Sequence, residues 1–339
     1  MDNALSMDKR SKRLLAGAVG LAGLGWLGFI VTVTARQNNM LFNPIRRKEV
    51  DRPRSSKHRT RPVVLRCHDG TRLSGWLLTP RTPGPHAAAI YFGGRSEEVS
   101  WAVRDAQRMF PGMLVLAINY RGYGDSHGSP AERHMIDDGT MLYDWLLASG
   151  QHVDPGRIAI VGRSLGSSVA LQVAARRTVA ALVLITPFDS VLAMVKKRLP
   201  SVPVSLVLKH RFESIKVAPK VATPVLVLRA ESDNIVPQVH TDILVAELPN
   251  VVSDAVVPGS NHLDIPYLDE TQEHILQFMQ GRLSGRPALT PKPQRQTAEE
   301  KLLSEIASVQ LGPEVTEPGP GEESERERGS ETHISGARI

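Results

Sequence analysis

Residues 158–177 read IAIVGRSLGSSVALQVAARR and predict a buried strand, a sharp turn and a helix in direct succession. The run at 158–161 is short, apolar and rich in β-branched side chains, as a buried strand requires. After the turn, apolar residues recur at roughly helical spacing, at Val169, Leu171, Val173 and Ala174. The turn itself, GRSLG at 162–166, therefore places one hydroxyl where a strand gives way to a helix.

The glycines of this turn indicate what the hydroxyl is for. A serine on a tight strand-to-helix turn has a strained backbone, and only small neighbours two residues away let strand and helix pack closely. Gly162 and Gly166 occupy those positions. The Ser164 hydroxyl then stands at a helix start, where the Leu165 amide faces a developing oxyanion. The pattern predicts a nucleophile elbow, and the alternative is an ordinary strand-turn-helix corner.

Composition and charge narrow the class of protein. The 339 residues are 41% hydrophobic, which is enough for one large α/β domain with extensions. The single cysteine, Cys67, excludes an intramolecular disulfide. The net charge of +6 is concentrated in residues 1–61, with 13 Lys and Arg against 4 Asp and Glu, which leaves 28 against 31 elsewhere. Because the main body is mildly acidic, nucleic acid is not an expected partner.

An uncharged apolar stretch lies near the N-terminus, at residues 14–35. As a helix it would be about 33 Å long, enough to cross a bilayer. It exceeds the apolar core of a signal peptide, about 7 to 15 residues, so a permanent single-pass transmembrane anchor is favoured over a cleaved signal peptide. A buried soluble helix is the third alternative. Basic residues flank both ends, in a tail at 1–13 and a linker at 36–61, so the side of the membrane stays open.

From residue 62 to residue 282, short apolar runs alternate with helical patterns. Strands are predicted at 63–66, 73–78, 87–92, 113–118, 158–161, 181–185, 225–228 and 251–257. Helices are predicted after the elbow and at 97–109, 135–148 and 271–279. This alternation predicts an α/β domain with a mostly parallel eight-stranded sheet flanked by helices. Residues 187–224 interrupt it as a short cap, and residues 283–339, rich in Pro, Gly, Ser and Glu, predict a largely disordered tail.

Two further patterns invite a cofactor, and neither carries one. Gly122, Gly124 and Gly128 have the spacing G-x-G-x-x-x-G, which is not that of a dinucleotide-binding turn, and no helix opens at once. His127 and His134 lie near several aspartates without a recognisable metal-ligand spacing. We therefore expect no metal and no organic cofactor.

Three motifs in this order resemble those of α/β-hydrolase-fold serine hydrolases: YRGYG at 120–124, GRSLG at 162–166 and DNIVP at 233–237. More narrowly, they are similar to the membrane-anchored alpha/beta hydrolase domain-containing branch, which is related to serine aminopeptidase-like hydrolases. The resemblance covers about residues 62–282. It implies cleavage of an acyl ester, thioester or lipid through an acyl-enzyme on Ser164. A peptidase or aminopeptidase, or a catalytically silent membrane-tethered binding module, are the alternatives.

The other catalytic groups are expected beyond the carboxyl ends of the later strands, where parallel sheets place their sites. Asp233 follows the strand at 225–228 and is the candidate acid, with Asp189, after the preceding strand, as its rival. His262 follows the last apolar strand and would accept the Ser164 proton while Asp233 sets its tautomer. The order Ser164, Asp233, His262 agrees with that of α/β hydrolases.

The resemblance also implies an oxyanion hole made of two backbone amides. Leu165 would supply one by its position after the serine. The other is expected from the loop after the strand at 87–92, at Gly94 or Arg95, and the choice between them stays open. In the cap, apolar residues are expected to line an acyl pocket while basic residues meet lipid head groups; the apolar residues are Leu199, Val202, Val204, Leu206 and Val207. The expected partners are a small acyl or lipid substrate and a membrane.

Overall fold

Nine strands form one mixed sheet in the computed structural model, which describes residues 9–46, 55–284 and 309–311. The strands are β1 His58–Arg66, β2 Arg72–Pro80, β3 His86–Phe92, β4 Leu114–Ile118, β5 Val153–Arg163, β6 Ala181–Ile185, β7 Val225–Ser232, β8 Val251–Asn261 and β9 Val309–Leu311. Their order across the sheet is β8-β7-β6-β5-β3-β4-β2-β1-β9. Every pair from β8 to β4 is parallel, and the pairs that involve β2, β1 and β9 are antiparallel. All eight predicted strands are present, most of them longer than predicted.

The ninth strand corrects the prediction of an eight-stranded sheet. β9 lies in the segment that the sequence predicts to be largely disordered, and it pairs antiparallel with β1, with Val63 opposite Leu311. The rest of the tail, 285–308 and 312–339, lies outside the described residues, so its predicted disorder stays a prediction. A strand of three residues has too little pattern of its own to be recognised, because its position depends on the edge of β1 that it pairs with.

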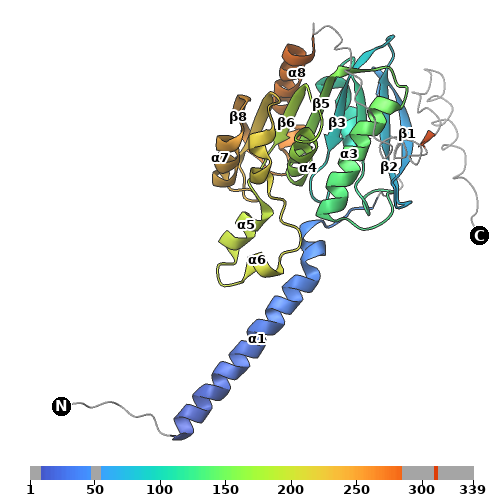
Figure 1. Cartoon of the computed structure of the whole chain (residues 1–339). Helices are drawn as coiled ribbons and strands as arrows, with labels where there is room; N and C mark the ends of the chain where they lie inside the picture. Colours follow the sequence, from blue (N-terminus) through green and yellow to red (C-terminus); the bar gives the residue numbers. More distant parts are fainter. Residues whose placement is uncertain (1–8, 47–54, 285–308, 312–339) are drawn as a thin grey trace, which may run out of the picture.

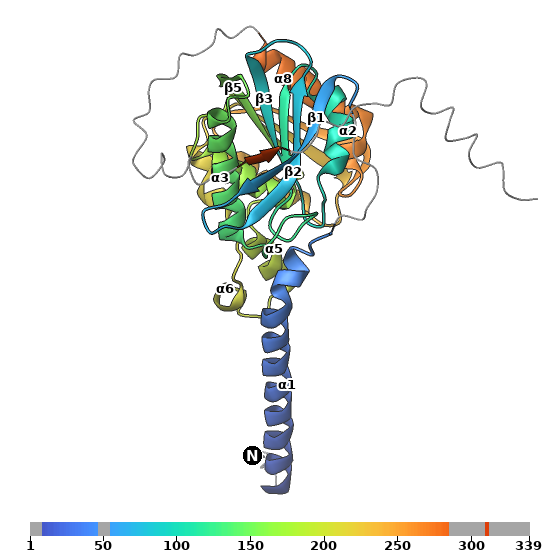
Figure 2. The ribbon, with the colours of Figure 1, turned by 90° about the vertical axis from the view of Figure 1, so that its right-hand side faces the viewer.

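Helices cover both faces of the sheet (Figure 2). One hydrophobic core therefore lies on each face of the sheet. The main ones are α2 Ser100–Met109, α3 Glu132–Ala148, α4 Leu165–Ala174, α7 Gln238–Glu247 and α8 Asp269–Leu283. Successive residues of β5 face opposite cores: Ile158 and Ile160 pack with α3 and α4, whereas Ala159 and Val161 pack with α2 and α8. A strand buried on both faces shows no polar alternation, which is why it appears in the sequence as a continuous apolar run.

The cap between β6 and β7 consists of α5 Val191–Arg198, α6 Val204–Val207 and two short 3-10 turns. These elements lie within residues 187–224, and this segment is called the cap below, after the prediction. Of the five apolar residues expected to line an acyl pocket, Val202 and Val204 are buried while Leu206 is 86% exposed, so Leu206 shares no enclosed pocket with those two and the acyl pocket stays a prediction. Helix α6 is a single turn, so neighbouring positions face opposite directions rather than one cavity.

Helix α1, Lys9–Leu41, projects from the domain and continues past the predicted anchor (Figure 1). The C-terminal end of α1 packs on the cap through the side chain of Gln37. Its Nε2 donates to the Val207 carbonyl at 3.2 Å, and its Oε1 accepts from the Lys209 backbone amide at 2.8 Å. Phe42, just after the helix, is fully buried against Phe212. The predicted linker at 36–61 therefore includes the C-terminal end of α1, which contacts the cap, and the start of β1. Among the residues whose side chains are described, no helix is both long and apolar enough to span a membrane.

Candidate active site

The serine of the GRSLG turn lies between β5 and α4 with a backbone that few residues adopt. Its φ is 49° and its ψ is −115°, and its amide donates to the Ile185 carbonyl at 2.8 Å. The two flanking glycines are required sterically: a Cβ at position 162 would lie 2.6 Å from the Ala170 Cβ, and one at 166 would overlap the Phe92 carbonyl oxygen. The strain at Ser164 is thus maintained by close packing on both sides, as in a nucleophile elbow.

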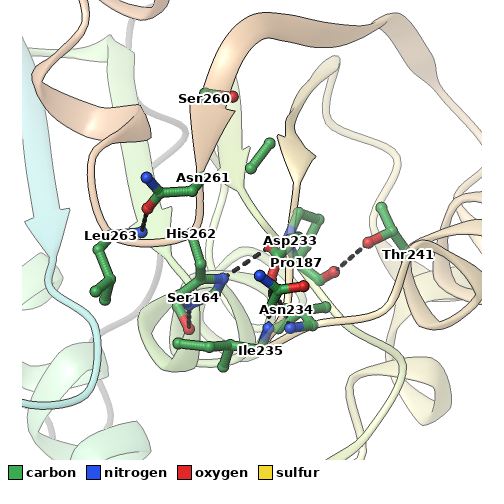
Figure 3. Close-up of polar contacts among 12 residues, drawn as sticks. Ser164, Pro187, Asp233, Asn234, Ile235, Thr241, Ser260, Asn261, His262 and Leu263 are labelled. Atoms are coloured by element: carbon green, nitrogen blue, oxygen red, sulfur yellow. Dashed lines mark hydrogen bonds and ion pairs between the residues drawn. The ribbon is translucent and has the colours of Figure 1, made fainter.

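A continuous hydrogen-bonded chain runs from this serine to a carboxylate (Figure 3). The Ser164 Oγ lies 2.9 Å from His262 Nε2, and His262 Nδ1 lies 2.8 Å from Asp233 Oδ2. All three side chains are buried. Since a carboxylate only accepts, Nδ1 carries the proton, and Nε2 is left as the acceptor for the serine hydroxyl.

The Asp233 carboxylate is fixed by its own loop. Its Oδ1 accepts from the amides of Ile235 and Val236 at 2.9 and 2.7 Å, while Oδ2 accepts from His262. The loop follows β7, and His262 follows β8, so the acid and the histidine come from adjacent parallel strands. Both side chains therefore lie at the carboxyl edge of the sheet, where the strand order predicts them.

Asp189, the rival acid, pairs with a different histidine. Its Oδ1 lies 2.9 Å from His240 Nδ1, and both side chains are buried. The Asp189 amide donates to the His240 carbonyl at 3.1 Å, which joins the start of the cap to α7. The structure therefore places Asp189 in a second aspartate-histidine pair rather than beside His262.

The two candidates for the second oxyanion amide differ in availability. The Gly94 amide donates to the Glu97 carboxylate at 2.7 Å, so it is already engaged and is not available to an oxyanion. Gly94 does lie beside the nucleophile, because a Cβ there would be 3.5 Å from the Ser164 Cβ. Of the predicted pair, Arg95 remains, together with the Leu165 amide at the first residue of α4.

Two charged residues beside the triad were not predicted to have a role. Arg163 and Glu97 form an ion pair at 2.9 Å, with side chains only 8% and 4% exposed. Burial is the largest single effect and lowers the pKa of Arg163, but Glu97, Tyr91 and Tyr267 together outweigh it and the pKa is raised, so the guanidinium stays charged. The signal available in the sequence is a charged residue at the end of an apolar strand, which needs a buried partner of opposite charge.

The structure also bears on the cofactor question. Within the described ranges, no group of three or more His, Cys, Asp or Glu side chains is arranged to hold a metal ion. The His127 ring lies 2.9 Å from the Arg72 guanidinium. Burial raises the pKa of the Cys67 thiol to about 12, so this cysteine is held in its protonated, unreactive form.

Comparisons with known proteins agree with this architecture. The family described as alpha/beta hydrolase fold matches residues 99–205. The uncharacterized protein Rv2307c of Mycobacterium tuberculosis is 34% identical over 253 residues, which cover 74% of this chain and 89% of that protein. The chain therefore belongs to the alpha/beta hydrolase family.

More distant relatives include proteins named for an activity. The lysophosphatidylserine lipase ABHD12 of Danio rerio is 33% identical over 144 residues, 36% of each chain. Among solved structures, an esterase of Pyrococcus furiosus, Pf2001, superposes with a TM-score of 0.56 at 20% identity and covers 71% of this chain and 99% of its own. An acetyl xylan esterase from Paenibacillus sp. R4 has a TM-score of 0.56 at 19% identity, over 69% and 87% of the two chains. At such identities the structures show a shared fold.

Proposed function

We infer that this alpha/beta hydrolase is a serine hydrolase that cleaves an acyl ester, thioester or lipid through an acyl-enzyme on Ser164. The observation that carries the proposal is the unbroken chain of hydrogen bonds from Ser164 through His262 to Asp233. It joins a strained, buried serine to a base whose tautomer is set by a carboxylate. That arrangement is what nucleophilic acyl transfer requires.

The proposed reaction has two halves. Ser164 Oγ attacks the acyl carbonyl carbon while His262 Nε2 takes its proton, and the carbonyl π pair moves to oxygen, where the Leu165 and Arg95 amides stabilise it. The tetrahedral intermediate collapses as His262 protonates the leaving group, whose departure leaves an acyl-enzyme on Ser164. Water then attacks the acyl carbon with His262 as general base, and the proton returns to Ser164 as the acid product leaves.

Exposed apolar residues next to the triad favour an acyl substrate. Leu263, which follows the catalytic histidine, is 65% exposed, and Ile235, two residues after Asp233, is 44% exposed (Figure 3). Side chains of this kind beside a buried nucleophile suit an aliphatic chain better than a charged peptide terminus. The lipase and esterase names among the relatives point in the same direction.

A fluorophosphonate probe tests the nucleophile directly. Wild-type protein should be labelled covalently, Ser164→Ala should not, and His262→Ala should be labelled far more slowly. Ser168→Ala is a matched control from the same helix, because its buried hydroxyl has no hydrogen-bond partner among the described residues. Labelling of Ser164→Ala at the wild-type rate, or no labelling of folded wild type, would show that the mechanism is wrong.

A substrate panel then separates the remaining alternatives. Short and long acyl esters, acyl thioesters and aminoacyl amides should be offered to folded wild-type protein that has not been exposed to the probe, and we expect Ser164-dependent turnover of esters or thioesters. Turnover of aminoacyl amides alone would favour a peptidase. Folded protein that neither labels nor turns over any substrate would be a silent binding module.

We further propose that residues 14–35 anchor the enzyme in a membrane. Several side chains of α1 are apolar and more than half exposed, namely Leu21, Leu24, Leu27 and Val31. The cap, with its exposed Lys196 and Lys197, lies at the end of the domain from which α1 projects (Figure 1). Exposed apolar surface with adjacent basic residues suits an anionic bilayer.

The anchor is tested by alkaline carbonate extraction of membranes from cells that express the full chain. Retention in the pellet is expected, and full release into the supernatant would exclude an integral anchor. The mass of the protein recovered from the pellet reports whether residues 14–35 are still attached.

A further inference from the structure

One buried ion pair touches three parts of the proposed active site. Arg163, between Gly162 and Ser164, donates through Nη1 to Glu97 Oε2 at 2.9 Å. Its Nη2 donates to the backbone carbonyls of His262 and Leu263, at 3.1 and 3.0 Å. Since Arg163 is also the residue before the nucleophile, a single guanidinium is joined to the serine, to the histidine loop at 261–264 and to Glu97.

Glu97 connects the same guanidinium to the oxyanion loop, residues 93–97. Its Oε2 accepts from the Gly94 amide at 2.7 Å as well as from Arg163. Its Oε1 accepts from the Tyr91 hydroxyl at 2.6 Å and from the Trp101 indole nitrogen at 2.8 Å. With four donors on two oxygens, the carboxylate has little freedom to move, and the conformation of the loop that carries the Arg95 amide depends on it.

The pair is shielded from solvent on the side of the histidine loop. The Tyr267 ring lies 5.8 Å from the Arg163 guanidinium carbon, and Trp101 packs edge-on against Tyr267 at a ring separation of 4.7 Å. The Arg163 Nε has no hydrogen-bond partner among the described residues, so the pair is held through the two terminal nitrogens. A buried charge pair held in this way resists displacement, because movement would leave a charge unpaired in a low-dielectric interior.

We propose that Arg163 and Glu97 are a positioning pair, which aligns the oxyanion loop and the His262 backbone with Ser164. The proposal rests on the serine-hydrolase function above. Neither residue reaches the substrate in this role; each acts through the groups that it holds. Those groups stabilise the transition state, so loosening them lowers kcat more than it raises KM.

The structure contains a control for the weakening of a buried charge pair. Arg121 donates to both oxygens of Asp138 at 2.8 Å, and both side chains are 8% exposed, close to the exposure of Arg163 and Glu97. This pair has no contact with Ser164 or His262 among the hydrogen bonds of the described residues. Arg121→Lys therefore measures what a weakened buried pair does to the fold alone.

The test compares Glu97→Gln, Arg163→Met, Arg163→Lys and the double variant Glu97→Gln/Arg163→Met with Arg121→Lys, all in the full chain. Ester hydrolysis is measured below the melting temperature of each variant. The two single charge removals should lower kcat at least about tenfold with KM changed by less than about twofold, and Arg163→Lys should recover part of the loss. The double variant should fall no further than the worse single variant, because the two residues act as a unit. Arg121→Lys should keep kcat within about twofold even if its melting temperature falls.

Amide hydrogen exchange gives a second readout that does not depend on activity. Peptides that cover 93–97 and 261–264 should exchange faster in Glu97→Gln and Arg163→Met than in wild type. In Arg121→Lys, the same peptides should exchange at the wild-type rate. Wild-type kcat in the folded Glu97 and Arg163 variants, an equal fall in Arg121→Lys, or unchanged exchange in both loops would each overturn the positioning role. An inactive wild type would count against the proposed function, and exchange alone would then decide the pair.

Discussion

Two aspartate-histidine pairs lie beyond the ends of neighbouring strands, and they are built almost alike. Asp233 follows β7 and lies 2.8 Å from His262 Nδ1, whereas Asp189 follows β6 and lies 2.9 Å from His240 Nδ1. All four side chains are buried. They differ in what the rest of each histidine meets: His262 Nε2 is 2.9 Å from the Ser164 hydroxyl, and His240 lies on α7, bound to the start of the cap.

The difference separates an aspartate-histidine bond from the further contact that the proposed catalysis needs. In both pairs the carboxylate orients the ring and selects its tautomer. Chemistry requires in addition that the second nitrogen face a nucleophile, and only the pair on β7 and β8 meets Ser164. The Asp189 pair instead joins two backbone segments, because the Asp189 amide also donates to the His240 carbonyl at 3.1 Å.

The largest contrast is expected between the two histidines. His262→Gln removes the proposed base and should lower kcat by about 10⁴-fold or more, with the protein still folded. His240→Gln should keep kcat within about threefold and instead lower the free energy of unfolding by about 1–3 kcal/mol, since the buried hydrogen bond to Asp189 is lost. Steady-state ester hydrolysis and urea unfolding of both variants check this. Equal losses of kcat would remove the distinction between the pairs.

Replacing the acids should give a somewhat smaller contrast. Asp233→Asn favours the wrong histidine tautomer, so we expect kcat to fall by about 10³- to 10⁴-fold with little change in KM. Asp189→Asn should leave kcat near the wild-type value and lower stability. The measurement is kcat and KM for all three proteins at one temperature. A stronger effect of Asp189→Asn on kcat would make Asp189 the functional acid.

A smaller effect is expected at the residue that follows Asp189. The Ser190 hydroxyl accepts from the Ala193 amide at 3.0 Å and caps the N-terminus of α5. Ser190→Ala should therefore cost about 1 kcal/mol of stability, while kcat stays unchanged. Thermal unfolding and ester turnover measure the two quantities. Ser190→Thr, which keeps the capping oxygen, is the control and should recover most of the stability.

The smallest effect concerns a third buried histidine, whose ring meets uncharged groups. His58 lies 3.1 Å from the Ser55 hydroxyl and 3.0 Å from the Met113 carbonyl, and burial lowers its pKa. Below about pH 6.5 the unfolded chain takes up a proton that the folded chain resists. The free energy of unfolding should thus fall as the pH drops from about 6.5 toward the folded pKa. Urea unfolding at several pH values tests this, and His58→Gln should show a shallower slope.

Much of the fold was predictable because it is encoded locally. The strands that are buried on both faces are continuous apolar runs, and the elbow requires glycine at two exact positions. The chain order of serine, acid and histidine could be aligned with the strand ends, and the structure brings those three side chains together. The role of Asp189 was not predictable, since its partner His240 lies 51 residues away on a helix.

The sequence by itself determined the alternation of strands and helices, the strained serine and the order of the groups that meet it, because short-range periodicity and steric limits specify them. Only the tertiary structure decided which histidine each aspartate meets, that the Gly94 amide is engaged by Glu97, and that Arg163 bridges two loops. Pairing of this kind is decided by the burial of charges from distant segments. A charge in the interior takes whichever partner the packing of the sheet and its helices brings within reach.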